Sequence, residues 1–486
     1  MSHTVPPLAS GVAEKCTSRG TRGVVSATAP EAAWVGRDAF LAGGNAFDAA
    51  LAAALAETVL LPPKCGLAGD LVALCLRPGH PPRALVAVGP APAALGDTVR
   101  RQGALPTTGG LAVGVPGAPA GYTALARLGA LGLARAARPS ADLANRGFSW
   151  SPVNDRYLRR SRELLEQQNP NGTAYLPRGR PIPVGSRVTV PGLAHVLDEF
   201  VRREADLFAG PIGDALVAAV HARGGVITAE DLSRAEARWE EPIRATVAGR
   251  RLCATPAPTH GPSLLGALAE AGAAADAVTL WKAVEGAVAA RDRDVGDIHG
   301  DAGTSVITAA DADGNAVVVV HSNSHPTFGS GIVLEPHALV LANRAGRGFS
   351  SEPGHPNFPH LRRRPVTTLH AWSLGPADGR PALMGATPGG ESQMPWNAQV
   401  VQRLLRGASP ADAILAPRWA RGSGGALEIE EGFPAADRAA LANAVATSDV
   451  PLWSLWSGMQ VVTVGDSSEP LTVAADIRST GGTAAY

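Results

Sequence analysis

The chain is poor in cysteine, in charge and in signals for export, and each shortage narrows the classes of protein to which it can belong. Four cysteines among 486 residues, without a C-x-x-C spacing, are too few to crosslink a chain of this length. Charged residues make up only 18%, and 43 basic residues balance 43 acidic ones, so nothing indicates binding to nucleic acid or to an anionic membrane surface. The first residues lack the basic segment and apolar stretch of a secretory signal. We therefore expect a soluble protein of a reducing compartment, the cytoplasm.

Long hydrophobic runs are also missing. The nearest one, Phe47–Leu61, contains Asp48 and Glu57, so we expect no membrane span. Its alanine-rich face predicts a buried and closely packed helix instead.

Two enzyme motifs are absent as well. No G-x-S-x-G elbow supports Ser-His-Asp catalysis, and Gly66–Gly69 lacks the lysine of a phosphate-binding loop, so close backbone packing explains its glycines.

The order of the predicted elements indicates the fold class. The length allows one large domain or two to three smaller ones. Short strands are predicted near residues 24–26 and 71–76, residues 138–238 are mainly helical and polar, and further strands and helices follow residue 304. Such blocks of strands and helices predict a layered α/β protein with one sheet packed against another.

The strongest local signal is a β-hairpin that begins at Thr304. Two β-prone apolar runs flank a turn with Asp313-Gly314, which is the pattern most typical of a hairpin. A three-residue loop ending at Gly314 would place Thr304 opposite Ser322, whereas a two-residue Asp-Gly loop would place it opposite Asn323. In either register Thr304 opens a strand and meets a second polar side chain.

A Gly-Thr step at the start of a strand favours one kind of chemistry. If the peptide bond between Gly303 and Thr304 is cut, the new α-amine lies about one hydrogen-bond reach from the threonine hydroxyl and can act as its base. One residue would then supply both nucleophile and base. The alternative is an ordinary hairpin with a threonine at its edge, because threonine is favoured in strands. Other parts of the chain must decide between the two.

Eight blocks of the sequence, in the same order, resemble the γ-glutamyltransferase family of N-terminal-nucleophile hydrolases. They are Gly43–Ala56, Gly114–Tyr122, Gly224–Leu232, Thr304–Val317, Phe328–Leu334, Arg363–Leu369, Thr387–Gly390 and Ala416–Trp419. The resemblance implies a four-layer αββα sandwich and a chain that cuts itself before a threonine. By position the cut falls between Gly303 and Thr304, giving a large subunit, residues 1–303, and a small subunit, residues 304–486.

The resemblance also implies roles for individual residues. Thr304 would be the nucleophile, Ser322 would support it with the hydroxyl of a family threonine, and the amides of Gly389-Gly390 would form the oxyanion hole. Thr367-Thr368 stand where the family has a serine pair that contacts the substrate carboxylate. The substrate would be a small molecule with an acyl group, and no cofactor or metal is expected.

The same stretches depart from the glutamyl-specific enzymes. The arginine that holds the substrate's α-carboxylate is absent from residues 86–94, and the D-D-F triplet whose aspartate holds the α-amine is replaced by Arg347-Gly348-Phe349. Glu391 follows TPGG where a serine is usual, and the glycine-rich lead-in to an early strand reads GLAGDL. Each lost charged contact is worth about 1.5–3 kcal/mol. The chain thus resembles a divergent, non-glutamyl branch, and glutathione is a poor candidate substrate.

Three functions remain open. Divergent members of the family act on other acyl groups, as oxamate amidohydrolases do, and we expect an amide substrate of this kind. A second possibility is cleavage of a carbon–carbon bond in an oxalyl-type keto acid, as in actinobacterial pathways to alkylproline units. The third is an unprocessed, catalytically silent relative used for binding. It stays open because the segment between Arg293 and Thr304 is much shorter than in the family, and the scissile turn must be strained by what precedes it.

Further side chains are candidates for the substrate pocket. His321 and His325 lie four residues apart at a strand end without an adjacent glutamate, so a zinc site is not expected, but one of them is expected to contact substrate. Asn323 lies between these two histidines, so it is a further candidate for contact with the substrate. Arg364 could bind an anionic acyl group, with a structural or solvated arginine cluster as the alternative. Trp396 could line the pocket, although a buried aromatic is the commoner role.

Overall fold

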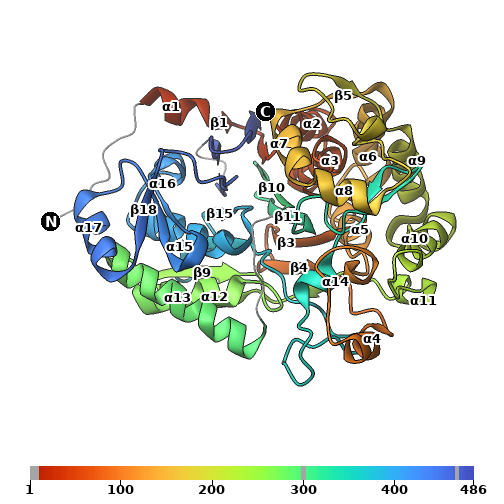
Figure 1. Cartoon of the computed structure of the whole chain (residues 1–486). Helices are drawn as coiled ribbons and strands as arrows, with labels where there is room; N and C mark the ends of the chain where they lie inside the picture. Colours follow the sequence, from red (N-terminus) through yellow and green to blue (C-terminus); the bar gives the residue numbers. More distant parts are fainter. Residues whose placement is uncertain (1–9, 297–302, 466–469) are drawn as a thin grey trace.

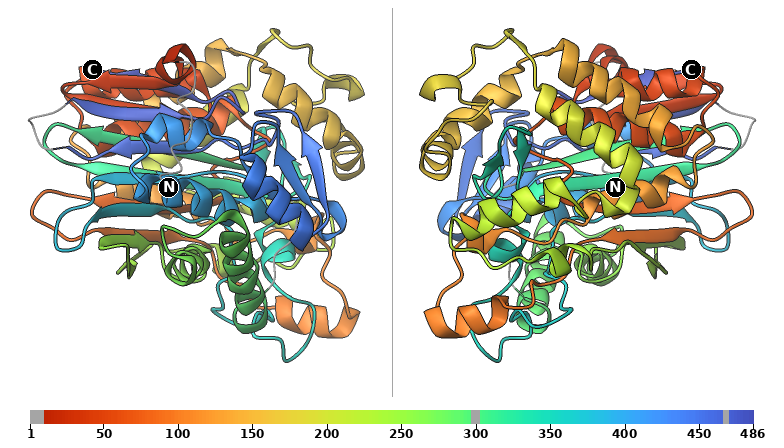
Figure 2. Two further views of the ribbon diagram at one scale, coloured as in Figure 1. Left: turned by 90° about the vertical axis from the view of Figure 1, so that its left-hand side faces the viewer. Right: turned by 90° about the vertical axis from the view of Figure 1, so that its right-hand side faces the viewer.

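The computed structural model describes residues 10–296, 303–465 and 470–486. Two antiparallel sheets of seven strands form the centre of this part of the chain, packed face to face with helices outside (Figure 1). Sheet A has the order β1 (Thr17–Gly20), β20 (Leu471–Ala475), β19 (Gln460–Thr463), β15 (Leu383–Ala386), β14 (Trp372–Pro376), β9 (Arg250–Ala254) and β8 (Ile243–Val247). Sheet B has the order β21 (Gly482–Ala485), β2 (Gly23–Ala27), β10 (Gly303–Asp311), β11 (Ala316–Ser324), β3 (Asp70–Leu76), β4 (Arg83–Ala87) and β7 (Arg238–Glu240). In Figure 2 the strands of both sheets run across the molecule in nearly the same direction, as in aligned sheet packing.

Helices cover the outer face of each sheet. Sheet B is covered by α2 (Pro30–Leu41), α3 (Ala46–Leu60) and α5 (Ala118–Ala126), with α6 (Leu133–Arg146) and α9 (Pro191–Arg203) behind them. Sheet A is covered by α12 (Gly261–Ala271), α15 (Gln393–Leu405) and α16 (Pro410–Leu415), with α13 (Ala277–Asp294) packed on α12 and α15, and α17 (Ala435–Ala444) behind α13. A separate apolar core fills the space between the sheets and takes residues such as Val306 and Met384 from their inner faces. The predicted αββα sandwich is therefore confirmed.

Smaller elements surround this sandwich. The remaining helices are α1 (Ser10–Lys15), α4 (Leu95–Gln102), α7 (Pro152–Arg160), α8 (Arg162–Gln168), α10 (Pro211–His221), α11 (Ala229–Leu232) and α14 (Arg344–Gly348). Short sheets pair β5 (Phe148–Ser149) with β6 (Arg187–Val188), β12 (Val333–Leu334) with β13 (Leu339–Val340), and β17 (Leu427–Glu430) with both β16 (Trp419–Arg421) and β18 (Thr447–Val450). In the ranges that the structure describes, no helix is both long and apolar enough to cross a membrane, and the four cysteines are free and buried.

Helix α3 lies directly against β10 and β11. All of its residues are buried, as its alanine-rich sequence predicts. Its start is fixed by a capping box, in which the Asn45 side chain accepts from the Asp48 amide and the Asp48 carboxylate accepts from the Asn45 amide. The helix ends just before Pro62, which cannot continue it. Its last turn carries Glu57 beneath the start of β10.

The β10–β11 hairpin has the register that a three-residue loop predicts, because Thr304 pairs with Ser322. Gly314 has φ +85°, the left-handed conformation that this loop requires. The amide of Asp311 donates to the carbonyl of Asn315 at 3.0 Å and closes the loop. Local turn chemistry therefore determines which side chain faces Thr304.

The register shifts by one residue between Gly303 and Thr304. Gly303 pairs with Ser324 while Thr304 pairs with Ser322, so Asn323 is the extra residue of a β-bulge. A bulge bends its strand and re-aims the neighbouring side chains. The expected cut site thus lies at an irregular point of an otherwise continuous sheet.

Candidate active site

Ser322 joins the two groups that a self-cleavage reaction needs. The Oγ1 atom of Thr304, a residue 2% exposed, lies 3.0 Å from the Oγ atom of Ser322. The Ser322 hydroxyl donates to the carbonyl of Gly303 at 2.5 Å and accepts from the amide of Ser324 at 2.8 Å. Since the single Ser322 proton goes to that carbonyl, the Thr304 hydroxyl must be the donor in the Thr304–Ser322 bond. One serine therefore contacts both the hydroxyl of the expected nucleophile and the carbonyl just before the expected cut.

Gly389 and Gly390 form a tight turn between β15 and α15. Their φ angles are +136° and +54°, which favour glycine at both positions. A Cβ atom on Gly389 would lie 2.3 Å from Cζ3 of Trp396, so no larger residue fits against the indole. The turn therefore brings bare backbone to this point of the molecule.

A hydrogen bond between the sheets places this turn at the Thr304 end of β10. Ala386, the last residue of β15, pairs with Gln460. The side chain of Gln460 donates to the carbonyl of Val306 at 2.7 Å. Strand β15 ends at Ala386, and Gly389 follows three residues later. The end of β15, three residues before Gly389, therefore lies at the level of Val306, which is two residues beyond Thr304.

A cleft of about 380 Å³ opens beside the turn. Both Gly389 and His325, which follows the bulge, line it. Its cationic residues are Lys64, Arg156, Arg160 and Arg421, and its aromatic residues are Tyr157, Trp396 and Trp456. Glu428 is the one acidic side chain among the described lining residues. The walls are therefore aromatic and mainly basic.

The backbone of Lys64 lies beside the expected cut. Its Cα atom lies 3.5 Å from the point where a Cβ on Gly303 would stand. The side chain is 3% exposed, and its Nζ atom lies 6.0 Å from the ring centre of Tyr157. Arg156 lies over Trp456, with Cζ 3.7 Å from the ring centre. Neither cation forms an ion pair within the described ranges, so the cleft keeps an unneutralised positive charge.

His325 adds a neutral ring to the cleft. Burial lowers the pKa of His325 to about 4, and Arg347 contributes to that shift. Its Nδ1 atom has no hydrogen-bond partner in the part of the chain that the structure describes. His325 is thus available to a substrate as an uncharged hydrogen-bonding group, whereas His321 is buried on the α3 side of sheet B.

The other residues predicted for substrate binding lie around the cleft and not on its wall. The hydroxyl of Thr368 donates to the side-chain oxygen of Gln393 at 3.2 Å, directly after the glycine turn. Thr367 is fully buried and accepts from the Leu369 amide. Asn323 is fully buried as well, and its side chain donates to the carbonyl of Pro62.

Arg364 binds acidic residues of the chain itself. Its guanidinium lies 3.8 Å from Glu236 and 3.6 Å from Glu240, and it is not among the residues that line the cleft. Asn323 packs its amide against Gly66 and Gly69, so the GLAG glycines serve close packing, as the sequence predicts.

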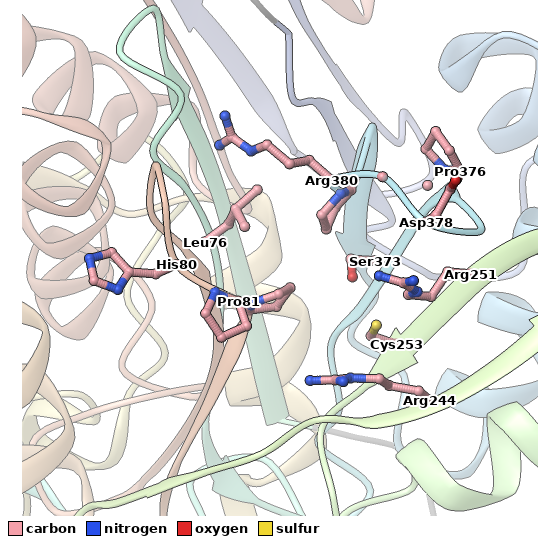
Figure 3. Close-up of a pocket in the computed structure, with 14 residues that line it drawn as sticks. Leu76, His80, Pro81, Arg244, Arg251, Cys253, Ser373, Pro376, Asp378 and Arg380 are labelled. Carbon is pink, nitrogen blue, oxygen red and sulfur yellow. The ribbon is translucent and has the colours of Figure 1, made fainter.

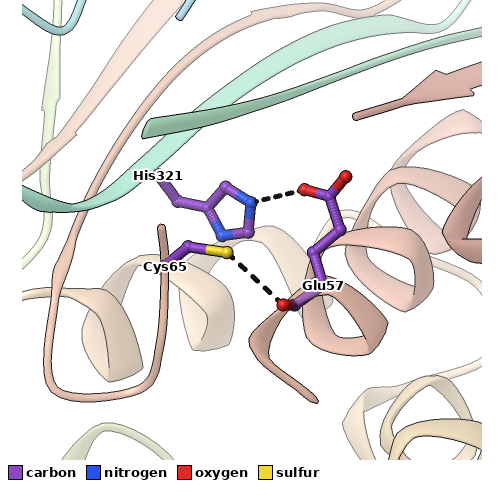
Figure 4. Close-up of side chains that lie close together, drawn as sticks. All are labelled: Glu57, Cys65 and His321. Carbon is purple, nitrogen blue, oxygen red and sulfur yellow. Dashed lines mark hydrogen bonds and ion pairs between the residues drawn. The ribbon is translucent and has the colours of Figure 1, made fainter. Parts of the chain in front are cut away.

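Sequence reasoning missed a buried group of side chains behind the nucleophile strand (Figure 4). Glu57, Cys65 and His321 each offer a possible metal ligand, and these atoms lie within 4.8 Å of one another. The ligand atoms of Glu57 and His321 already have hydrogen-bond partners. His321 Nε2 lies 2.9 Å from Glu57 Oε2, and His321 Nδ1 lies 2.7 Å from the Tyr122 hydroxyl. The geometry therefore favours a hydrogen-bonded network over a metal centre.

A second cavity, of about 350 Å³, lies at the other end of the sandwich (Figure 3). Its wall includes Leu76, Arg251, Cys253 and Ser373. Strand β3 begins at Asp70, opposite Ser322, and runs its full length before it reaches Leu76. This cavity is therefore remote from the bulge and holds none of the residues that the sequence assigns to the site.

The four-layer sandwich, with a cleft at the start of a central strand, is the architecture of the N-terminal-nucleophile hydrolases, and comparisons with known proteins agree. The family model for gamma-glutamyltranspeptidase matches residues 32–299 and 274–486. The chain belongs to this family.

Curated relatives and a solved structure give the same result. The acylase ACY 1 proenzymes of Pseudomonas strains V22 and SE83 are 30% and 29% identical to this chain. The alignment with the V22 protein covers 88% of both sequences, and that with the SE83 protein covers 90% of this chain and 89% of the relative. The crystal structure of cephalosporin acylase from Bacillus halodurans is 26% identical, covers 100% of this chain and 98% of its own, and superposes with a TM-score of 0.86.

Proposed function

We propose that the chain is the precursor of a self-processing hydrolase or acyltransferase in which Thr304 attacks an acyl substrate. The observation that carries this proposal is the contact of the Ser322 hydroxyl with both Thr304 Oγ1 and the Gly303 carbonyl. The cut separates residues 1–303 from residues 304–486. Relatives named as proenzymes support the processing step.

In the first reaction Thr304 Oγ1 attacks the carbonyl carbon of Gly303. The Ser322 hydroxyl polarises this carbonyl and stabilises the negative charge that develops on its oxygen. The carbon–nitrogen bond breaks, the nitrogen takes the proton of the hydroxyl, and an ester between Gly303 and Thr304 remains. Water hydrolyses the ester, which leaves a carboxylate on Gly303 and a free α-amine on Thr304.

In the second reaction the same hydroxyl attacks the carbonyl of a bound substrate. The α-amine of Thr304 takes the hydroxyl proton and delivers it to the leaving amine. The amides of Gly389 and Gly390 stabilise the oxyanion, because the turn presents bare backbone beside the cleft. Ser322 orients the nucleophile, and His325 lines the acyl pocket. Water, or an acceptor amine, then releases the acyl group from Thr304.

The acyl group is not γ-glutamyl. Residues 86–94 lack the arginine that would hold an α-carboxylate, and Arg347 stands where an acidic residue would hold an α-amine. Positive charge from Lys64, Arg156 and Arg160 instead favours an acyl group with a carboxylate further from the reacting carbonyl. The aromatic side chains of the cleft supply flat apolar surface beside these cations.

Intact mass spectrometry tests the proposal. The purified chain is expected to give two fragments that join between Gly303 and Thr304, and Thr304→Ala is expected to stay intact. An uncut wild-type chain after long incubation would reject the proposal and favour a silent binding relative. A panel of amides assayed beside α-keto acids separates amide hydrolysis from carbon–carbon cleavage by the same Thr304.

A further inference from the structure

Glu57 contacts both strands of the nucleophile hairpin from behind. Ser305 and His321 are cross-strand partners, one step along from the Thr304–Ser322 pair. Because side chains alternate between the two faces of a sheet, Ser305 and His321 face helix α3 while Thr304 and Ser322 face the other way. The Oε2 atom of Glu57 accepts from Ser305 Oγ at 2.5 Å and lies 2.9 Å from His321 Nε2.

The rest of the network fixes the protons. Burial raises the pKa of Tyr122 well above its ordinary value, so its hydroxyl keeps a proton and can donate to His321 Nδ1, 2.7 Å away. Because a carboxylate only accepts hydrogen bonds, His321 Nε2 is the donor in its contact with Glu57 Oε2, and Nδ1 of a neutral ring is left to accept from Tyr122. The second oxygen of Glu57, Oε1, accepts from the amide of Ala29 at 2.9 Å. Three donors thus satisfy a carboxylate that is 0% exposed.

We propose that Glu57 is a positioning residue that holds Thr304 in place through Ser305 after the chain has been cut. This inference rests on the proposed function of Thr304. Tyr122 and His321 complete the hydrogen-bonded network and fix the orientation of the Glu57 carboxylate.

The cut itself creates the need for such an anchor. In the uncut chain Thr304 is held from both sides, because Gly303 pairs with Ser324 and its carbonyl accepts from Ser322. After the cut Thr304 is a chain end, and chain ends fray unless they are tied down. Its own hydroxyl must break its bond to Ser322 during the reaction. The Ser305–Glu57 bond is then the first buried side-chain anchor that the reaction does not consume.

Acylation of Thr304 by p-nitrophenyl acetate, followed by the intact mass of the small fragment, tests the proposal without knowledge of the natural substrate. Ser305→Ala and Glu57→Gln are expected to cut themselves to completion but to acylate at least about tenfold more slowly, because a small misplacement of a nucleophile costs this much or more. Ser305→Thr keeps the hydroxyl and is expected to recover most of the rate. A merely structural role would not separate self-cleavage from acylation in this way.

Thr308→Val is the matched control. It removes an equally buried hydroxyl from the same strand, one that bonds to Ser26 at 2.7 Å and does not touch Glu57. Its acylation rate is expected to stay close to that of the wild type. If Ser305→Ala acylates as fast as Thr308→Val, the positioning role is wrong while the function of Thr304 stands. If the wild type itself is neither cut nor acylated at Thr304, the proposed function has failed instead.

Discussion

Asp70 and Arg344 lie 274 residues apart in the chain and form a buried ion pair, with Arg344 Nε 2.6 Å from Asp70 Oδ2. Asp70 belongs to GLAGDL and Arg344 to ANRAGRGF, two stretches in which the sequence departs from the glutamyl-specific enzymes. The ion pair therefore joins the two stretches, with Arg344 three residues before the Arg347-Gly348 replacement. It lies beside the site, because Asp70 pairs with Ser322 across β3 and β11. Burial raises the pKa of Asp70, and the charge of Arg344 opposes that shift.

Removing one half of this pair is expected to destabilise the protein strongly. Arg344→Met leaves the buried Asp70 carboxylate without its cation, at a cost of roughly 3–5 kcal/mol in the free energy of unfolding. Urea unfolding followed by circular dichroism measures the loss. The double variant Asp70→Leu/Arg344→Met is expected to recover most of it, because no uncompensated charge remains. If the double variant lost as much stability as Arg344→Met and Asp70→Leu added together, the result would contradict this interpretation.

Self-cleavage is expected to depend on the Ser322 hydroxyl. Ser322→Ala leaves the Gly303 carbonyl without its donor, and loss of one such donor typically slows a reaction by about 10²–10³-fold. The fraction of cut chain over time, read from denaturing gels, gives the rate. Ser322→Thr restores the hydroxyl and should cut at close to the wild-type rate. Equal rates for Ser322→Ala and Ser322→Thr would show that the hydroxyl is not needed.

The glycine turn is expected to serve acyl transfer and not self-cleavage. Gly389→Ala puts a methyl group 2.3 Å from Trp396 Cζ3 at a φ of +136°, so the turn must shift and the oxyanion donors with it. We expect complete self-cleavage but an acylation rate by p-nitrophenyl acetate that falls about 10²-fold. Gly389→Ala/Trp396→Leu removes the clash but not the backbone strain, and it should recover only part of the rate. Normal acylation by Gly389→Ala would exclude this turn as the oxyanion hole.

Acid is expected to weaken the fold through buried histidines. Burial lowers the pKa of His325 and of His370 from 6.5 to about 4, and it lowers that of His260 well below 6.5. Between pH 6.5 and 4 the unfolded chain therefore binds protons that the folded chain does not, so stability falls as pH falls. Each histidine contributes up to about 1.4 kcal/mol per pH unit to the free energy of unfolding.

His370→Gln isolates one of these contributions. His370 Nδ1 donates to the carbonyl of Thr368, and its Nε2 accepts from Asn397, roles that a glutamine can fill without titrating. Urea unfolding at pH 7, 6 and 5 is expected to show a smaller loss of stability in His370→Gln than in the wild type. Identical losses would contradict the assignment.

The basic wall of the cleft is expected to select acyl groups that carry a carboxylate. The p-nitroanilide of succinate should be a better substrate than that of butyrate, which has the same chain length but no charge. Arg156→Gln is expected to raise KM for the succinyl compound by roughly tenfold, as expected for the loss of one charge-assisted hydrogen bond, and to leave the butyryl compound unaffected. Arg159→Gln is the matched control, because Arg159 is exposed on the same helix and pairs with Asp155. An equal effect of both variants would exclude direct recognition.

The sequence predicts those parts of the site that local chemistry determines. The Asp-Gly turn predicts a hairpin in which Thr304 faces Ser322 or Asn323, and the structure has the Ser322 register. The alanine-rich sequence predicts the burial of α3. The order of the eight family-like blocks and the pattern of predicted strands are enough to predict the αββα sandwich. These features depend on residues close together in the chain, for which turn types and periodicity are reliable guides.

The remaining features depend on contacts between distant segments. Glu57 meets His321 across 264 residues, and no spacing in the sequence relates them. The sequence makes Arg364 a candidate for substrate binding, but only the fold shows its ion pairs with Glu236 and Glu240. The sequence does not predict the basic cleft, because α7 brings Arg156 and Arg160 to it from a stretch that the sequence identifies only as helical and polar.

The strand order of the two sheets has a consequence for the cut protein. In sheet B, β2 lies between β21 and β10, so a strand from before residue 303 is inserted among strands from after it. Sheet A has four central strands from after residue 303, and strands from before it lie on both sides, β1 at one edge and β9 and β8 at the other. Neither polypeptide can leave the other without losing ladder hydrogen bonds and opening the layers. Dilution should therefore not dissociate the pair, whereas a denatured, cut protein must regain its partner by diffusion, a bimolecular step that the intact precursor never faces.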